Sequence, residues 1–109
     1  MSISFALVRR LNSETNEYEY PNEKEEFNID LSVQYCYNER LYELINLNCE
    51  TYGFESFDIS TYDCETAFRS NKIYYLYESL LYEKDVPKDL IHFIYILYHN
   101  QDLYIQYCY

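Results

Sequence analysis

Apolar and polar residues alternate along three stretches of the chain. The clearest is 27–37, where every odd position is apolar or aromatic and every even position is polar or a small thiol. Residues 3–8 alternate around Ile3, Phe5 and Leu7, and residues 103–109 alternate at the C-terminus. A period of two residues is typical of a strand with one face on a core and the other toward solvent. We therefore predict three strands of an antiparallel sheet.

Two shorter segments also favour extended structure. Residues 12–16 have the composition of a turn, and 17–20 favour a short exposed strand that ends before Pro21. Proline lacks the N–H that the interior of a strand needs. Residues 54–59 form a connector that has room for one more short strand.

Helical spacing dominates most of the remaining chain. The first predicted helix begins at Asn38, a favourable N-cap, and ends at Gly53. Its apolar positions are Leu41, Leu44, Ile45 and Cys49. A second helix is predicted from a cap at 60 or 61 to about 84, with a break at 70–71, and a third begins at 85–87 with Pro87 near its first position. The apolar stripe of the third helix is Leu90, Ile91, Ile94, Leu97 and Tyr98.

This order of elements predicts one α+β domain that spans residues 1–109. We expect an antiparallel sheet of three to five strands, about three helices packed on one of its faces, and a C-terminal strand that returns to the sheet. The tetrapeptide Gln-Tyr-Cys-Tyr occurs at 34–37 and at 106–109. Its tyrosines fall on the same strand face in both copies, which indicates two similar strands rather than a repeated site.

Charge narrows the class of partner. Nineteen acidic residues stand against eight basic ones, for a net charge of −11. Segments 14–30 and 39–65 each contain seven acids and one base, so each carries −6, and the rest of the chain sums to +1. Such a surface repels nucleic acid and anionic membranes and attracts a basic protein. Charge that serves only solubility is the alternative explanation.

Tyrosines are interleaved with these acids, and tyrosine provides a large contact area at protein interfaces. The alternative is that the acids form a solvated face and the tyrosines cover the edge of a core. The predicted partner-binding residues are Glu17, Tyr18, Glu19, Tyr20, Glu23, Glu25, Glu26, Glu50, Tyr52, Glu55, Asp58, Tyr62 and Asp63.

Sequence motifs for catalysis or metal binding are not found. No two cysteines have the Cys-x₂-Cys spacing of a zinc site, and His92 and His99 would lie about 10 Å apart on a helix. The single glycine, Gly53, allows no Gly-rich phosphate loop. We expect no cofactor, no metal and no enzymatic activity.

The four cysteines are interpreted as reduced thiols of a cytoplasmic protein, because the N-terminus has no export signal and no apolar run is long enough to span a membrane.

In size, charge and lack of Gly-rich loops, the chain resembles the small acidic inhibitors of bacteria and phages. These include immunity proteins that neutralise a nuclease toxin and anti-CRISPR proteins that block a nucleic-acid-binding effector. The resemblance implies a cytoplasmic immunity protein that occludes the active site of a basic toxin domain, as a monomer or weak homo-oligomer. An anti-CRISPR or nucleic-acid mimic is one alternative. The other is a self-associating structural module built on the tyrosines Tyr74, Tyr75, Tyr77, Tyr82, Tyr95 and Tyr98.

Overall fold

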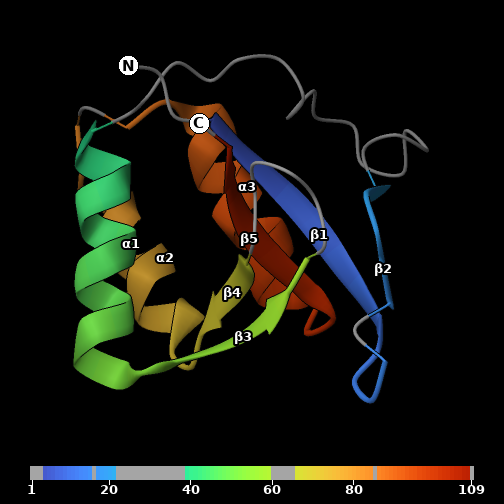
Figure 1. Cartoon of the computed structure of the whole chain (residues 1–109). Coiled ribbons are helices and arrows are strands. Elements are labelled where there is room, and N and C mark those ends of the chain that lie inside the picture. The colour runs from blue at the N-terminus through green and yellow to red at the C-terminus, as the bar shows by residue number, and fades with distance from the viewer. Residues whose placement is uncertain (1–3, 16, 22–38, 60–65, 85, 109) are drawn as a thin grey trace.

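The computed structural model describes residues 4–15, 17–21, 39–59, 66–84 and 86–108. The described elements are β1 (Ser4–Asn12), β2 (Glu17–Glu19), α1 (Glu39–Tyr52), β3 (Phe54–Asp58), β4 (Thr66–Ser70), α2 (Ile73–Leu81), α3 (Lys88–His99) and β5 (Leu103–Cys108). Within the described residues, the five strands form one antiparallel sheet in the order β2-β1-β5-β4-β3 (Figure 1). The predicted α+β class is confirmed.

β5 is the central strand of this sheet. It pairs with β1, where Leu7 lies opposite Ile105, and with β4, where Phe68 lies opposite the same Ile105. The predicted return of the C-terminal strand to the sheet is therefore confirmed. The predicted strand at 27–37, which contains the first Gln-Tyr-Cys-Tyr, lies outside the described residues.

The main core lies between one face of the sheet and the three helices. Alternate residues of β1 and β5, such as Phe5, Leu7 and Ile105, face the apolar sides of the helices. The predicted stripe of α1 is buried in this core, as are Leu90, Ile94 and Leu97 of α3. Tyr98 of the predicted α3 stripe is exposed instead.

A smaller apolar cluster lies on the opposite face of the sheet. Its buried members are Val8, Phe57, Ile59, Ala67 and Tyr104. Tyr18 and Tyr20 are half-buried against it. The two edge strands, β2 and β3, approach each other here. The ring of Tyr18 on β2 lies 6.5 Å from that of Phe57 on β3. The sheet is therefore curled and apolar on both faces.

The predicted second helix is wrong over its first part. Residues 66–70 form strand β4, and α2 begins only at Ile73. β4 is held by five residue pairs with β3 and by its contact with β5, so tertiary pairing overrides local helical spacing. The predicted break at 70–71 is the place where the strand changes to a helix.

Other boundaries differ less from the predictions. β1 runs on to Asn12 rather than ending at 8, because its second half pairs with β2. The optional strand at 54–59 is present as β3, and α1 ends before Gly53 as expected. None of the helices in the described segments has the length and apolar character needed to cross a membrane.

Candidate protein-binding surface

A groove of about 180 Å³ lies between α1 and α2. It is lined by Leu44, Leu47, Asn48, Thr51, Tyr52, Tyr75, Leu76 and Ser79. Leu44 and Leu76 belong to the buried core and form its apolar floor. Leu47, Tyr52 and Tyr75 are 60%, 43% and 45% exposed, so its upper walls are apolar and accessible. We call this feature the α1–α2 groove.

Carboxylates flank the groove on the side of α1. Glu43 and Glu50 lie one turn before and one turn after Leu47, so they share its helix face, and both are exposed. The basic residue of α1, Arg40, forms ion pairs with Glu83 at 2.8 Å and with Glu43 at 3.4 Å. The hydrogen bond from Arg40 lowers the pKa of the Glu83 carboxyl, and the same bond raises the pKa of Arg40. With three glutamates and one arginine, α1 carries a net charge of −2.

A chain of tyrosine rings continues from the groove across α2 and α3. The ring of Tyr52 lies 5.1 Å from that of Tyr75, which lies 6.0 Å from Tyr74. The remaining steps join Tyr74 to Tyr98 at 5.6 Å, Tyr98 to Tyr77 at 6.4 Å and Tyr77 to Tyr95 at 5.8 Å. We call these six residues the tyrosine ladder. All except the half-buried Tyr77 are exposed.

Polar groups anchor parts of this ladder. The hydroxyl of Tyr74 donates a hydrogen bond of 2.9 Å to Glu78, and this bond raises the pKa of the phenol. The imidazole of His99 lies 4.3 Å from the ring of Tyr95 and 4.8 Å from that of Tyr98. The ladder is thus an aromatic surface with Glu78 and His99 as polar neighbours.

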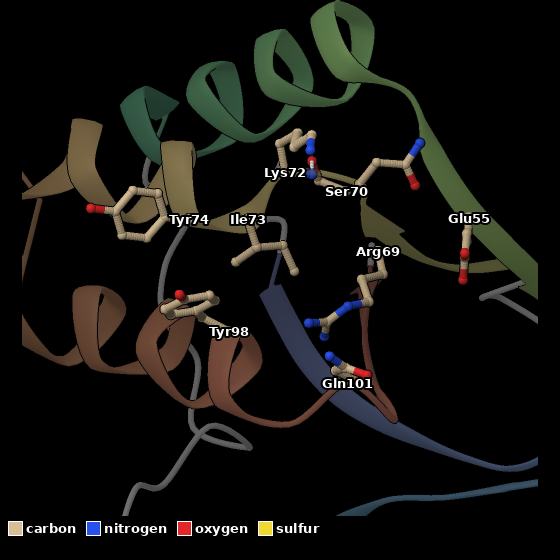
Figure 2. Close-up of a pocket in the computed structure, with 9 residues that line it drawn as sticks. Glu55, Arg69, Ser70, Lys72, Ile73, Tyr74, Tyr98 and Gln101 are labelled. Atoms are coloured by element: carbon tan, nitrogen blue, oxygen red, sulfur yellow. Dashed lines mark hydrogen bonds between the residues drawn. The ribbon is translucent and has the colours of Figure 1, made fainter.

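A second hollow, of about 380 Å³, lies on the other side of Tyr74 (Figure 2). Its walls come from β3, β4, the start of α2 and the end of α3. The lining residues are Glu55, Arg69, Ser70, Asn71, Lys72, Ile73, Tyr74, Tyr98 and Gln101. Two of its lining residues, Arg69 and Lys72, are cationic, whereas the whole chain has eight lysines and arginines.

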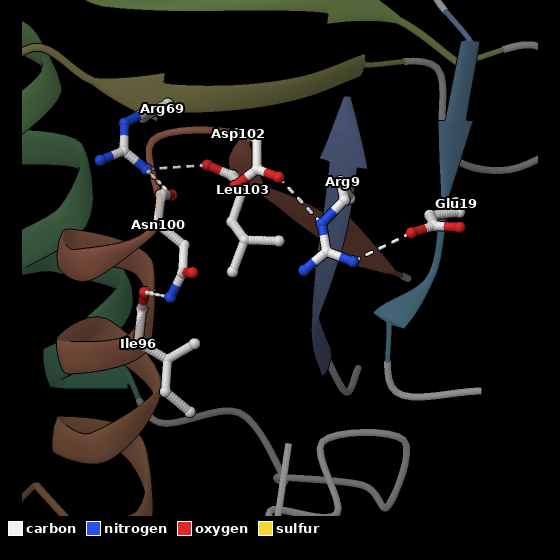
Figure 3. A network of polar contacts seen from close by, with 7 residues as sticks. All are labelled: Arg9, Glu19, Arg69, Ile96, Asn100, Asp102 and Leu103. Atoms are coloured by element: carbon white, nitrogen blue, oxygen red, sulfur yellow. Dashed lines mark hydrogen bonds and ion pairs between the residues drawn. The ribbon is translucent and has the colours of Figure 1, made fainter. Parts of the chain in front are cut away.

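Three of the four predicted partner-binding residues at and beside β2 make contacts within the molecule. Tyr18 and Tyr20 pack on the smaller apolar cluster, and their rings lie 5.7 Å apart. Glu19 forms an ion pair of 3.0 Å with Arg9, which also holds Asp102 at 2.9 Å (Figure 3). Glu17 is exposed at the start of β2.

The other predicted residues fall into separate places. Glu55 and Asp58 lie on β3, at the opposite end of the strand order from β2, and Glu55 accepts a hydrogen bond of 3.2 Å from the hydroxyl of Tyr104. Glu50 and Tyr52 lie at the α1–α2 groove. The remaining predicted residues, which lie outside the described residues, are Glu23, Glu25, Glu26, Tyr62 and Asp63. The structure therefore brings only Glu50 and Tyr52 of the described set to the groove.

Two further features bear on reactivity and metal binding: the Cys49 thiol and the grouping of possible metal ligands. Burial, with a smaller contribution from the charge of Glu50, raises the pKa of the Cys49 thiol to about 11, so it is protonated and unreactive at neutral pH. No cluster of three or more His, Cys, Asp or Glu side chains suited to a metal occurs among the described residues.

Sequence reasoning missed Leu47 and did not connect Tyr75 with α1. A signal for Leu47 exists, since it falls outside the apolar spacing of Leu44, Ile45 and Cys49 and between two glutamates. The partnership of α1 with α2 depends on the sheet and has no signal in the sequence.

Comparison of the chain with protein families, with curated proteins and with solved structures gave no match.

Proposed function

We propose that this protein is a cytoplasmic inhibitor of the immunity type, which binds a basic protein through the α1–α2 groove and neutralises it without catalysis or a cofactor. The partner we propose is a nuclease toxin domain. One observation carries the proposal: an exposed apolar centre of Leu47, Tyr52 and Tyr75 is flanked by Glu43 and Glu50, while Arg40 is held by carboxylates.

This arrangement has the anatomy of a protein interface. Stable interfaces have an apolar or aromatic centre and a polar rim that excludes water. Here Glu50 and the Arg40–Glu43 ion pair lie beside the apolar centre, and the whole chain carries −11. A partner with lysines and arginines around an apolar side chain would therefore be complementary in both respects, and would be attracted over a distance.

Inhibition would follow from the chemistry of the partner. A nuclease holds its substrate with cations that contact phosphates. Carboxylates such as Glu50 can pair with the same cations, so a bound inhibitor would exclude nucleic acid from the active site.

The test is a binding experiment with candidate nuclease toxin domains, taken first from the genes that neighbour the gene of this chain. Leu47→Ser should weaken the affinity by about tenfold or more, mainly through faster dissociation, because it removes the centre of the interface. Leu81→Ser is the matched control, since Leu81 is also an exposed helical leucine but does not line the groove. Equal effects of the two changes would reject the groove as the binding site.

Charge is tested separately by the association rate. The rate should fall as salt rises, and Glu50→Gln should lower it more than Glu14→Gln does at the exposed turn after β1. An association rate that does not respond to salt would contradict the electrostatic part. If the chain instead bound a CRISPR effector and excess nucleic acid displaced it, the alternative of an anti-CRISPR or nucleic-acid mimic would be favoured.

The tyrosine ladder favours a second candidate function, self-association. It offers an aromatic surface, exposed at every member except Tyr77, that a second copy could cover. Sedimentation at increasing concentration should then show a rising mass that Tyr95→Ser reduces. A monomer mass at all concentrations would dismiss this candidate.

A further inference from the structure

The 380 Å³ pocket beside Tyr74 is built around a fixed arginine. One terminal nitrogen of Arg69, Nη1, donates to the backbone carbonyls of Leu97, Asn100 and Leu103 at 2.8, 3.0 and 2.9 Å. Figure 3 shows Arg69 beside Asn100 and Leu103. These bonds hold the guanidinium in one orientation at the end of α3. Its Nε and Nη2 form no hydrogen bond with any described residue, so one edge of the fork retains its donors.

The positive charge of this pocket is not neutralised by ion pairs. Arg9 and Arg40 each hold two carboxylates, whereas neither Arg69 nor Lys72 forms an ion pair within the described part of the chain. Burial, the largest effect, lowers the pKa of the Arg69 guanidinium, and the nearby Tyr104, Glu55 and Asp102 only oppose this effect. An incoming anion would offset that cost of desolvation.

Apolar and polar groups define the rest of the pocket. Ile73 and the rings of Tyr74 and Tyr98 line one part, and Figure 2 shows the Arg69 guanidinium directed toward the side where Tyr98 and Gln101 lie. At the start of α2, Lys72 makes no side-chain cap and the first turn has no acidic residue, which adds to the positive potential.

We infer that this pocket binds a monocarboxylate with an apolar or aromatic body. The free Nε and Nη2 edge of Arg69 matches the planar, two-oxygen geometry of a carboxylate. The body of the ligand would lie against Ile73, Tyr74 and Tyr98. Glu55 in the lining and the net charge of −11 disfavour a phosphate dianion.

This site is separate from the α1–α2 groove and does not depend on the function proposed for it. The carboxylate could come from a free small molecule or from the C-terminus of a peptide. Both would use the same contacts, so the experiment includes both.

The test is an NMR titration of the ¹⁵N-labelled protein with sodium benzoate. We expect saturable shifts at the amides of Ile73 and Tyr74 and at Nε of Arg69, and no saturable shift with benzamide, which has the same ring without the charge. Lys72→Met should weaken benzoate by about fivefold, the effect of losing one partly exposed ion pair. Lys88→Met should leave it unchanged, because Lys88 is a lysine outside the pocket.

The remaining outcomes of this titration test the ligand class, the site and the source of the carboxylate. Tighter binding of phenyl phosphate than of benzoate would overturn the assignment to a carboxylate. Equal shifts with benzoate and benzamide, or no effect of Lys72→Met, would overturn the site. A short peptide ending in Phe with a free carboxylate should compete with benzoate and its amidated form should not, if the natural source is a chain end. If benzoate binds saturably and neither peptide competes with it, the natural carboxylate is assigned to a small molecule.

Discussion

Gly53 has a backbone φ of 82° and joins α1 directly to β3. Its carbonyl accepts a hydrogen bond of 3.0 Å from the N–H of Asn71, and the side chain of Asn71 donates to the carbonyl of Tyr52 at 3.2 Å. A Cβ at position 53 would lie 2.8 Å from Nδ2 of the Asn71 side chain. A single residue therefore fixes how the groove helix α1 meets the sheet.

Gly53→Ala should lower the free energy of unfolding by about 1–3 kcal/mol, because a side chain is disfavoured at positive φ. Urea denaturation measures the loss. Gly53→Asn places the same Cβ near Asn71 but tolerates positive φ better, so it should cost less. Equal losses would show that the contact with Asn71, rather than the backbone, is responsible.

Cys49 is 8% exposed and packs in the main core. Its pKa is raised from 9.0 to about 11, so between these values the unfolded chain loses the thiol proton while the folded chain keeps it. The contribution of this thiol to stability is thus complete below pH 9 and is lost as the pH rises toward 11.

Cys49→Ala removes this titration along with the sulfur. The variant should be less stable than the parent protein at neutral pH, and the difference in unfolding free energy should shrink between pH 9 and 11. Urea denaturation of both proteins across this range checks it. A difference that stays constant with pH would contradict the raised pKa.

At the scale of elements, β4 decides most of the arrangement. It pairs with β3 and β5, and its end is tied to α1 because the buried Ser70 hydroxyl donates to the side chain of Asn48. Arg69 of the same strand caps the last carbonyls of α3, which Asn100 also helps to satisfy by donating to Ile96 at 2.8 Å. β4 thus holds α1 and α3 in place through polar contacts.

Arg69→Gln should destabilise the protein by about 2–4 kcal/mol, because charge-assisted bonds to three carbonyls are lost and the carbonyls are left partly buried. Arg40→Gln is the control, since Arg40 is exposed and its partners are an exposed Glu43 and a half-buried Glu83, and it should cost clearly less. Thermal and urea unfolding of both variants compare them. An Arg40→Gln loss as large as that of Arg69→Gln would refute the capping role.

At the scale of the whole molecule, an excess of carboxylates is carried by a small fold with two apolar clusters. Among the described residues, Arg9 and Arg40 each contact two carboxylates, so two positive charges are shared by four negative ones. The net charge of −11 therefore acts on the folded surface, where like charges repel one another.

Adding salt should raise the free energy of unfolding at low ionic strength, because screening becomes effective as the Debye length falls to about 8 Å near 0.15 M. Potassium chloride and choline chloride should act equally, since screening depends on ionic strength and not on the cation. A fall in stability with salt would mean that the ion pairs outweigh the repulsion.

Local pattern was sufficient for the elements that bury one face. The period-two alternation at 103–109 predicted β5, and the stripe from Leu41 to Cys49 with Gly53 after it predicted α1, because each pattern follows from the geometry of one element on one core. The acid count alone likewise predicted a basic partner, and this stays a prediction.

Tertiary structure decided what depends on contacts between distant segments. Residues 66–70 became a strand because β3 and β5 supply its partners, and the predicted binding residues are spread over β2, α1 and β3. The pairing of Leu47 with Tyr75 and the meeting of Arg69 with the end of α3 also arise only when the sheet is formed. Sequence spacing encodes which face of an element is apolar, but which elements become neighbours is set by long-range packing.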